Sequence, residues 1–181
     1  MSLAIALAAR AVRAGSWLLV LGVPSIGIEA MDESGVPLQR VVAVDGDPAP
    51  GVWAERVAAA ADGFELILTS PPRGSERIER KVRQRLRARG AVLLAVPAAA
   101  GIDHQAGIDH QAGIDHRIGV DLRFSTSASR WVGIGDGHGR LVARELEIDL
   151  AGRRTPRPLR RTAWLPSPVG RPASPAFDRV G

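Results

Sequence analysis

The run Trp17-Leu18-Leu19-Val20-Leu21 decides how this chain folds. It is continuously apolar and has the length of a strand, a pattern typical of a strand buried on both faces of a parallel sheet. Three further apolar runs of this kind follow, at residues 41–44, 66–68 and 91–96. We therefore expect four buried strands in one sheet.

Alanine-rich or amphipathic segments separate these runs and are predicted to be helices. They cover residues 2–14, 24–34, 52–61 and 75–89. In the last of them Ile78, Val82 and Leu86 recur every four residues, which gives one apolar stripe that can meet the sheet. Strands that alternate with helices of this length need crossover connections, which are right-handed and produce a parallel sheet. The fold class is therefore predicted to be α/β.

A repeat follows residue 97. The hexad Gly-Ile-Asp-His-Gln-Ala recurs from Gly101 and supplies His104, His110 and His116. Imidazole and carboxylate groups could bind a transition metal if the segment folded around it. Structureless segments of this length are usually peripheral, so residues 97–118 are interpreted as an inserted, solvent-exposed loop and no metal site is assigned.

Beyond the repeat the pattern changes to the alternation of antiparallel strands. Residues 120–126, 130–134, 141–150 and 162–165 are the candidate strands, with a glycine-rich turn at 135–139. Residues 166–181 are rich in Pro, Ser and Arg and are predicted to be disordered. The rest, residues 1–165, is expected to form one domain.

Composition limits the class of protein. With no cysteine in 181 residues, the chain can form no disulfide, zinc–thiolate site or iron–sulfur cluster. Aromatic residues make up 4%, too few for a nucleic-acid surface built on stacked rings. No apolar run approaches the roughly 18 residues that a membrane span needs. We expect a cytoplasmic protein that makes no membrane contact.

The loop after the first strand has the glycine spacing of a phosphate-binding loop. Gly22 and Gly27 are separated by four residues, as in G-x-x-x-x-G-K-[ST]. Ile28 replaces the lysine of that motif, and Glu29 replaces its hydroxyl with an anion that would repel a nucleotide. A simple turn from strand to helix is therefore the preferred interpretation.

Two groups of basic residues could bind a partner. The first lies near the end of the ordered chain, has no nearby acid in the sequence and consists of Arg153, Arg154, Arg157, Arg160 and Arg161 beside Trp164. Arg and Trp often dominate protein interfaces, so we interpret this cluster as a partner surface. The alternative is that Trp164 packs on the domain's own sheet. The second group lies on the predicted helix at residues 75–89, between Arg77 and Arg89. Glu76 and Glu79 share the outer face of this helix with the basic residues, which favours a solvated surface.

The order of elements resembles the RecA core. Several stretches are also similar to the ImuA-type accessory proteins of actinobacteria, RecA-like members of a damage-inducible mutasome. These stretches are residues 14–27 (AGSWLLVLGVPSIG), 35–44 (GVPLQRVVAV), 121–124 (DLRF) and 131–141 (WVGIGDGHGRL). The resemblance covers about residues 2–165 and implies a RecA-like three-layer core with a mostly parallel sheet, extended by C-terminal antiparallel strands.

The same resemblance shows where the chain departs from an ATPase. In the RecA register the phosphate-binding loop and the strand leading into it fall before Ser2, so that strand is expected to be missing. The position of the catalytic glutamate falls near Val23, and that of the Walker B aspartate falls near Thr69 or Ser70. No carboxylate then holds magnesium or activates water. We expect no ATP hydrolysis, no cofactor and no enzyme activity.

The function implied by the resemblance is that of a non-catalytic adaptor in SOS-induced, error-prone translesion DNA synthesis. The implied partners are a catalytically inactive Y-family polymerase homologue and the error-prone C-family polymerase of the mutasome, with a weak DNA contact as a further expectation. Two alternatives stay open. One is a RecA-like protein that binds DNA through its arginines, and the other is a SulA-like cell-division inhibitor.

Overall fold

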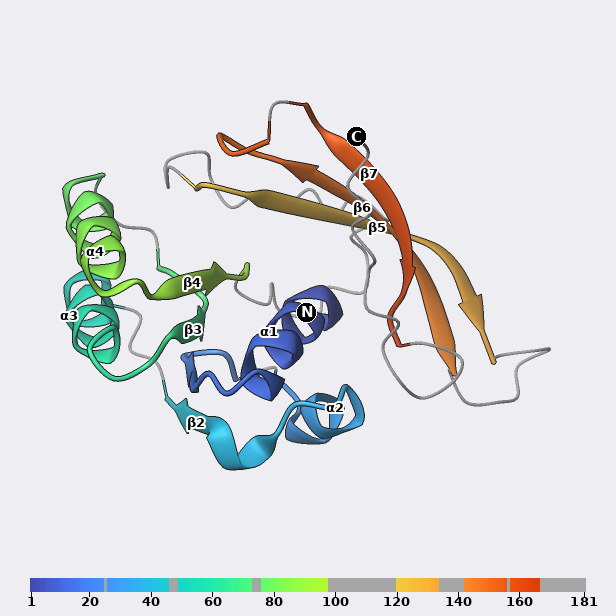
Figure 1. The fold of residues 1–181 in the computed structure, drawn as a ribbon, viewed down its shortest axis with the longest axis horizontal. Coiled ribbons are helices and arrows are strands. Elements are labelled where there is room, and N and C mark those ends of the chain that lie inside the picture. Colours follow the sequence, from blue (N-terminus) through green and yellow to red (C-terminus); the bar gives the residue numbers. More distant parts are fainter. Residues whose placement is uncertain are drawn as a thin grey trace.

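The protein contains a parallel and an antiparallel sheet (Figure 1). Its structure is a computed structural model that describes residues 1–24, 26–45, 49–72, 76–97, 120–133, 142–155 and 157–166. The hexad repeat with His104, His110 and His116, the turn at 135–139 and the tail from residue 167 lie outside the described residues. Among the described helices, none has both the length and the apolar character needed to cross a membrane.

The parallel sheet has four strands in the order β2-β1-β3-β4. They are β1 (Leu18–Leu21), β2 (Val41–Val44), β3 (Leu66–Thr69) and β4 (Val92–Ala95). Every residue of the central strands β1 and β3 is buried. The expectation of four buried strands is wrong for the two edge strands, where Val44 is 45% exposed and Val92 is 52% exposed. In the described sheet these two strands have a neighbouring strand on one side only, which leaves more of their side chains open to solvent at the margin of the sheet.

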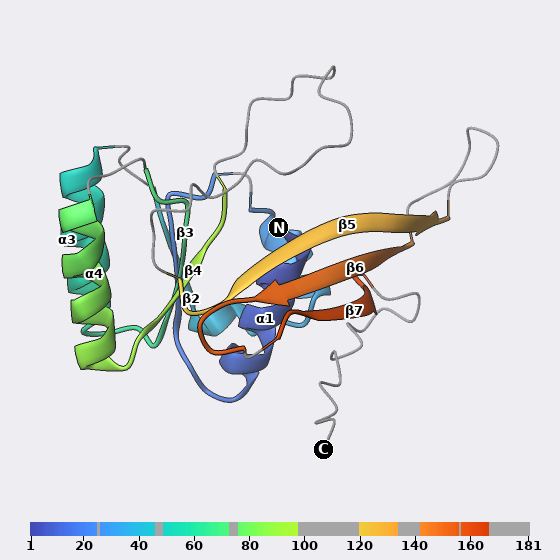
Figure 2. The same ribbon diagram turned by 90° about the horizontal axis from the view of Figure 1, so that it is seen from above.

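Helices cover both faces of this sheet, as Figure 2 shows with the sheet seen edge-on. On one face lie α1 (Ser2–Arg13) and α2 (Ile28–Glu33), and on the other lie α3 (Pro50–Ala60) and α4 (Glu76–Arg89). A short 3-10 helix, η1 (Leu38–Arg40), precedes β2. The predicted α/β class and the three-layer core are confirmed.

Alternate residues of the central strands divide between two hydrophobic clusters. Leu18 and Val20 of β1 pack with Val12 of α1 in the first cluster. Leu19 of β1 packs with Val57 of α3 in the second cluster. This division explains why β1 carries no polar residue, since successive side chains of a strand point to opposite faces and both faces are covered here.

The antiparallel sheet has the order β5-β6-β7. Its strands are β5 (Arg123–Val132), β6 (Ala143–Ala151) and β7 (Leu159–Trp164). The predicted segments 120–126 and 130–134 are thus one strand, which continues through a register shift between Ala128 and Arg130. The last strand also begins three residues earlier than the expected start at Thr162. The predicted antiparallel extension of the core is confirmed.

Helix α1 lies between the two sheets and contributes to both hydrophobic cores (Figure 2). Ile5 and Val12 face the parallel sheet. Leu3 packs instead against the antiparallel sheet, in a cluster with Leu146 and Ile148 of β6. The alternation of apolar and acidic residues along β6 therefore reflects one face on α1 and one face toward solvent.

Candidate partner interface

The chain leaves β1 for β2 on one side and continues with β3 and β4 on the other side of β1. In open α/β sheets, ligands usually bind at the carboxyl ends of the two strands that flank such a switch point, here β1 and β3. The loop after β1 enters α2, a helix of only six residues with Glu29 in its first turn. At the end of β3, the Trp53 indole N–H donates a hydrogen bond to Thr69 Oγ1 over 3.0 Å. The next residue, Ser70, has a buried hydroxyl without a hydrogen-bond partner. Hydroxyl groups thus occupy the two positions that the RecA register assigns to the Walker B aspartate.

The described residues contain no cluster of three or more His, Cys, Asp or Glu side chains that could hold a metal ion. The exposed basic groups of the chain form the other candidate surfaces.

The predicted arginine cluster is divided by the strand pairing of β6 and β7. Arg160 lies opposite Asp149, and its Nε donates to the Asp149 carboxylate at 2.7 Å. Its guanidinium also lies 3.1 Å from Glu147 Oε1. These contacts, first of all the hydrogen bond to Asp149, raise the pKa of Arg160. The expectation of an arginine cluster without acids is wrong here, because antiparallel pairing brings the acids of β6 beside β7.

The other arginines of the cluster point to different parts of the surface. Arg161 follows Arg160 on the strand and so lies on the opposite face, where its Nη1 donates to the Arg160 carbonyl at 2.9 Å. Arg153 lies 3.5 Å from Asp121. Arg154 and Arg157 are exposed on the connection between β6 and β7, and neither forms an ion pair within the described part of the chain. These two arginines remain the most available cations of the predicted cluster.

Trp164 is half-buried at the end of β7. It pairs in register with Glu145, and the Arg130 guanidinium lies 5.2 Å from the centre of its ring. Arg130 Nε in turn lies 3.7 Å from Glu145 Oε2. The indole is therefore held by neighbours on its own sheet and still has a solvent-facing portion.

Helix α4 carries the second basic surface. Glu79 is buried at 9% exposure on the side of Val82 and Leu86, so the interpretation that it shares the outer face is wrong. Its spacing of three and seven residues from Val82 and Leu86 places it on their side of the helix. One oxygen of the Glu79 carboxylate is buried without a hydrogen-bond partner.

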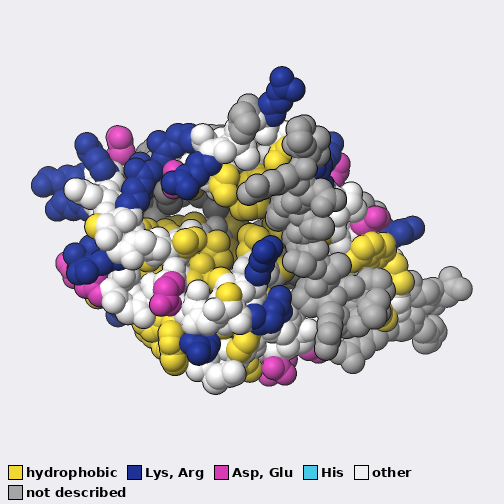
Figure 3. All heavy atoms as spheres, viewed as in Figure 1, with side chains coloured by type: hydrophobic (Ala, Val, Ile, Leu, Met, Phe, Trp, Pro, Cys, Tyr) yellow, Lys and Arg dark blue, Asp and Glu magenta, His cyan; other side chains and the backbone are white. Residues whose placement is uncertain are grey.

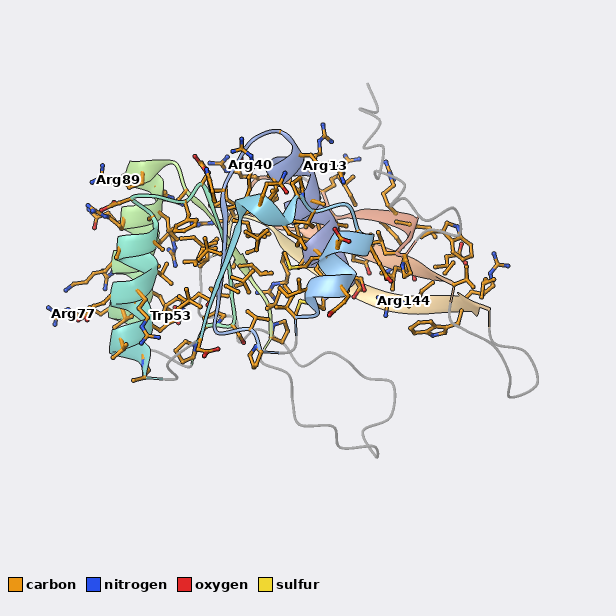
Figure 4. The ribbon with its side chains drawn as sticks, turned by 90° about the horizontal axis from the view of Figure 1, so that it is seen from below. Arg13, Arg40, Trp53, Arg77, Arg89 and Arg144 are labelled. Atoms are coloured by element: carbon orange, nitrogen blue, oxygen red, sulfur yellow. The ribbon has the colours of Figure 1, made fainter. Side chains whose placement is uncertain are left out.

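The cations of α4 differ between its two halves. In the C-terminal half, Arg85 and Arg89 bind Asp62 at 2.7 and 2.8 Å. In the N-terminal half, Arg77 and Lys81 are exposed, and no described carboxylate pairs with them. Figure 3 shows Lys and Arg side chains gathered on the α4 side of the molecule, and Figure 4 shows Arg77 directed away from the sheet. This free basic half is a second candidate surface.

The hairpin formed by β5 and β6 holds functional candidates that sequence reasoning missed. The Arg144 guanidinium lies 4.9 Å from the centre of the Trp131 ring, and Arg144 Nη2 donates to Ser2 Oγ at 2.9 Å. Burial lowers the pKa of Arg144. Burial and then the Arg144 charge lower the pKa of the Met1 amino group. No signal in the sequence reveals this pair, because Trp131 meets Arg144 only through the register shift between Ala128 and Arg130.

Comparison with known proteins gives a family assignment. No curated protein matches the chain. Residues 1–101 match a family model described as the MT3502 N-terminal domain, and this region runs from α1 past β4. Since the match covers more than half of the 181 residues, this chain belongs to the MT3502 N-terminal domain family.

Proposed function

We propose that this protein is a non-catalytic adaptor in SOS-induced, error-prone translesion DNA synthesis in the cytoplasm. Its partners are an inactive Y-family polymerase homologue and, through the same assembly, an error-prone C-family polymerase. The proposal is supported by the similarity of residues 14–27, 35–44 and 131–141 to ImuA-type accessory proteins and by the RecA-like α/β core.

One observation carries the non-catalytic part of the proposal. At the carboxyl edge of the parallel sheet, where a RecA-like ATPase holds its nucleotide, this chain has Ile28 and Glu29 after β1, Thr69 at the end of β3 and Ser70 directly after it. Thr69 is fully buried and accepts a hydrogen bond from Trp53, and the hydroxyl oxygen of the half-buried Ser70 is also shielded from solvent. Among these residues there is no lysine or arginine for a terminal phosphate, and hydroxyl groups stand where the Walker B aspartate would hold magnesium.

Charge reversal on the connection between β6 and β7 tests the adaptor role. Arg154→Glu with Arg157→Glu alters two exposed arginines that form no described ion pair, so the melting temperature should stay nearly unchanged. Binding of the purified polymerase homologue should weaken by about tenfold or more, as expected for loss of an interface arginine. Binding is measured by surface plasmon resonance.

A matched control separates a specific interface from general charge attraction. Arg77→Glu with Lys81→Glu reverses two exposed cations on α4 and produces the same change in net charge. Loss of binding in the first double variant alone supports the predicted surface. Loss in the α4 variant alone moves the interface to that helix, and a lack of binding by the wild-type chain contradicts the adaptor proposal.

A second candidate function is DNA binding through α4. The specific observation is the basic N-terminal half of this helix, where Arg77, Arg80 and Lys81 are exposed and the described residues supply no carboxylate to them. The logarithm of the DNA-binding constant would fall linearly with the logarithm of the salt concentration. Arg77→Glu with Lys81→Glu would make this line less steep, because fewer cations would contact phosphates.

A further inference from the structure

The tip of the β5–β6 hairpin carries an exposed apolar surface that the fold does not explain. Trp131 and Val142 are each 50% exposed, and Met1 is 46% exposed. The Val142 N–H donates to the Val132 carbonyl at 2.9 Å, which places Val142 where the two strands enter the turn. Isolated exposed aliphatic side chains are common, whereas a tryptophan exposed beside others is typical of interaction sites. We call Met1, Trp131, Val142 and Arg144 the tip patch.

A bulge in β5 places Trp131 in this patch. Thr126 pairs with Ile148, on the face of β6 that meets α1. Strict alternation from Thr126 would put Arg130 on that face and Trp131 on the other. The register shift between Ala128 and Arg130 reverses this order, so that Trp131 pairs with Arg144 and shares its face. Bulges often redirect a side chain near a functional site, and this one exposes an indole beyond the part of the sheet that α1 covers.

Arg144 is the fixed cation of the tip patch. Its guanidinium stacks on Trp131 and bonds to Ser2 at the start of α1. Its backbone is held as well, because its carbonyl accepts from the Leu165 N–H at 2.8 Å. Within the described residues no carboxylate pairs with Arg144, in contrast to Arg130 on the other face, which pairs with Glu145. Figure 4 shows Arg144 on the antiparallel sheet, well away from α3 and α4.

The composition of the tip patch specifies the chemistry of its occupant. Trp131 and Val142 offer apolar area, and Arg144 offers a positioned guanidinium that lacks a described carboxylate. A symmetric contact between two tip patches is a poor solution, since the patch contains no carboxylate to pair with Arg144 of the other copy. A lipid surface is also a poor occupant, because anionic lipids are bound by clusters of about four to eight cations.

We propose that the tip patch docks a segment of a partner protein in which a carboxylate flanks an apolar side chain. The apolar side chain packs on Trp131 and Val142, and the carboxylate pairs with Arg144. An arginine that is already oriented loses little conformational freedom when it forms such a pair. This inference rests on the proposed function, because it names the chemistry that the tip patch would recognise on the polymerase homologue.

A peptide probe tests the chemistry directly on the full chain. The probe is a fluorescent twelve-residue peptide with Glu-Leu-Phe-Asp at its centre, and its control carries Lys-Leu-Phe-Lys. Fluorescence anisotropy should show binding of the acidic peptide and at least tenfold weaker binding of the lysine peptide. Val142→Glu should weaken binding of the acidic peptide at least tenfold. Val92→Glu, at a matched exposure of 52%, should leave the affinity for this peptide unchanged.

Arg144→Met adds a readout that general damage to the hairpin would not give. It should abolish the preference for the acidic over the lysine peptide and leave the melting temperature within a few degrees of the wild-type value. Equal affinity of the two peptides for the wild-type chain overturns the proposal, and so does unchanged binding by Val142→Glu.

The full-length polymerase homologue then separates failure of this inference from failure of the proposed function. If it binds the wild-type chain and Val142→Glu equally well, the tip patch is not its docking site and the adaptor proposal stands. If it does not bind the wild-type chain, the adaptor proposal is wrong, and the peptide comparison still tests whether the tip patch binds an acidic, apolar segment. Self-association, or binding to phosphatidylglycerol vesicles, that Val142→Glu abolishes would assign the patch to another occupant and overturn the inference.

Discussion

Replacing Ile148 by alanine should loosen the contact between β6 and α1. The Ile148 side chain is 5% exposed and packs in the cluster that contains Leu3 of α1 and Leu165. Removing three carbons from a buried isoleucine costs about 2–5 kcal/mol, depending on how far the surroundings collapse. This cluster has few buried members and lies under a sheet with one solvent-facing side, so a loss of about 2–3 kcal/mol is expected.

Ile67→Ala is the matched control in the parallel sheet. Ile67 is fully buried in the central strand β3, in the larger cluster that α3 and α4 complete. Helices and neighbouring strands surround this position, which leaves less room for collapse. We therefore expect a loss of about 4 kcal/mol, above that of the Ile148 variant.

Urea unfolding measures both losses. Far-ultraviolet circular dichroism follows the helices, and tryptophan fluorescence follows Trp53 in the buried α3 cluster together with the partly exposed indoles. The free energy of unfolding comes from the midpoint and the slope of each transition. The reasoning is refuted if Ile148→Ala costs as much as Ile67→Ala, or if its cost stays below about 0.5 kcal/mol, the range of ordinary surface substitutions.

Three further outcomes are expected. Gly152→Ala should lower the melting temperature, with a loss of more than about 1 kcal/mol, because Gly152 has φ +154° and an added Cβ would collide with the Asp121 carbonyl; Gly51→Ala, with open space around it, should not lower it. The hydrogen bond from the backbone N–H of Trp17 lowers the pKa of Glu65 below its ordinary 4.5. The stabilisation that ionised Glu65 gives to the fold is therefore complete above pH 4.5 and is lost as the pH falls through the lowered pKa. Glu65→Gln should make the melting temperature depend less on pH in this acid range. Isothermal titration with ATP and magnesium should give no binding heat, and micromolar affinity at one site would contradict the non-catalytic proposal.

The sequence predicts the strands and helices of the parallel sheet better than it predicts how exposed the edge strands are. Each of the four apolar runs forms a strand, and in the central strands β1 and β3 burial on both faces explains why the run is so apolar. Their order in the sheet depends on how the crossovers are arranged, which no single run encodes. The margins at Val44 and Val92 therefore appeared only in the structure.

The surroundings of the candidate interface residues are harder to predict, because they depend on strand register. The acids Glu147 and Asp149 were visible as an alternating pattern, but their pairing with Arg160 requires the alignment of β6 with β7. The exposure of Trp131 depends on a one-residue bulge that leaves no mark in composition or periodicity. The charge of Glu79 predicts an outer position, whereas its spacing of three residues from Val82 places it on the buried side of α4.

The position of α1 between two sheets has a consequence for synthesis on the ribosome. This helix is translated before the described strands β1 to β7, and the Ser2–Arg144 hydrogen bond that links it to β6 spans 142 positions of the chain. At about 5–20 residues per second, the side of α1 that carries Leu3 waits roughly 7 to 28 s for its strands. During that interval the nascent chain presents an uncovered apolar helix face, a natural target for a ribosome-associated chaperone.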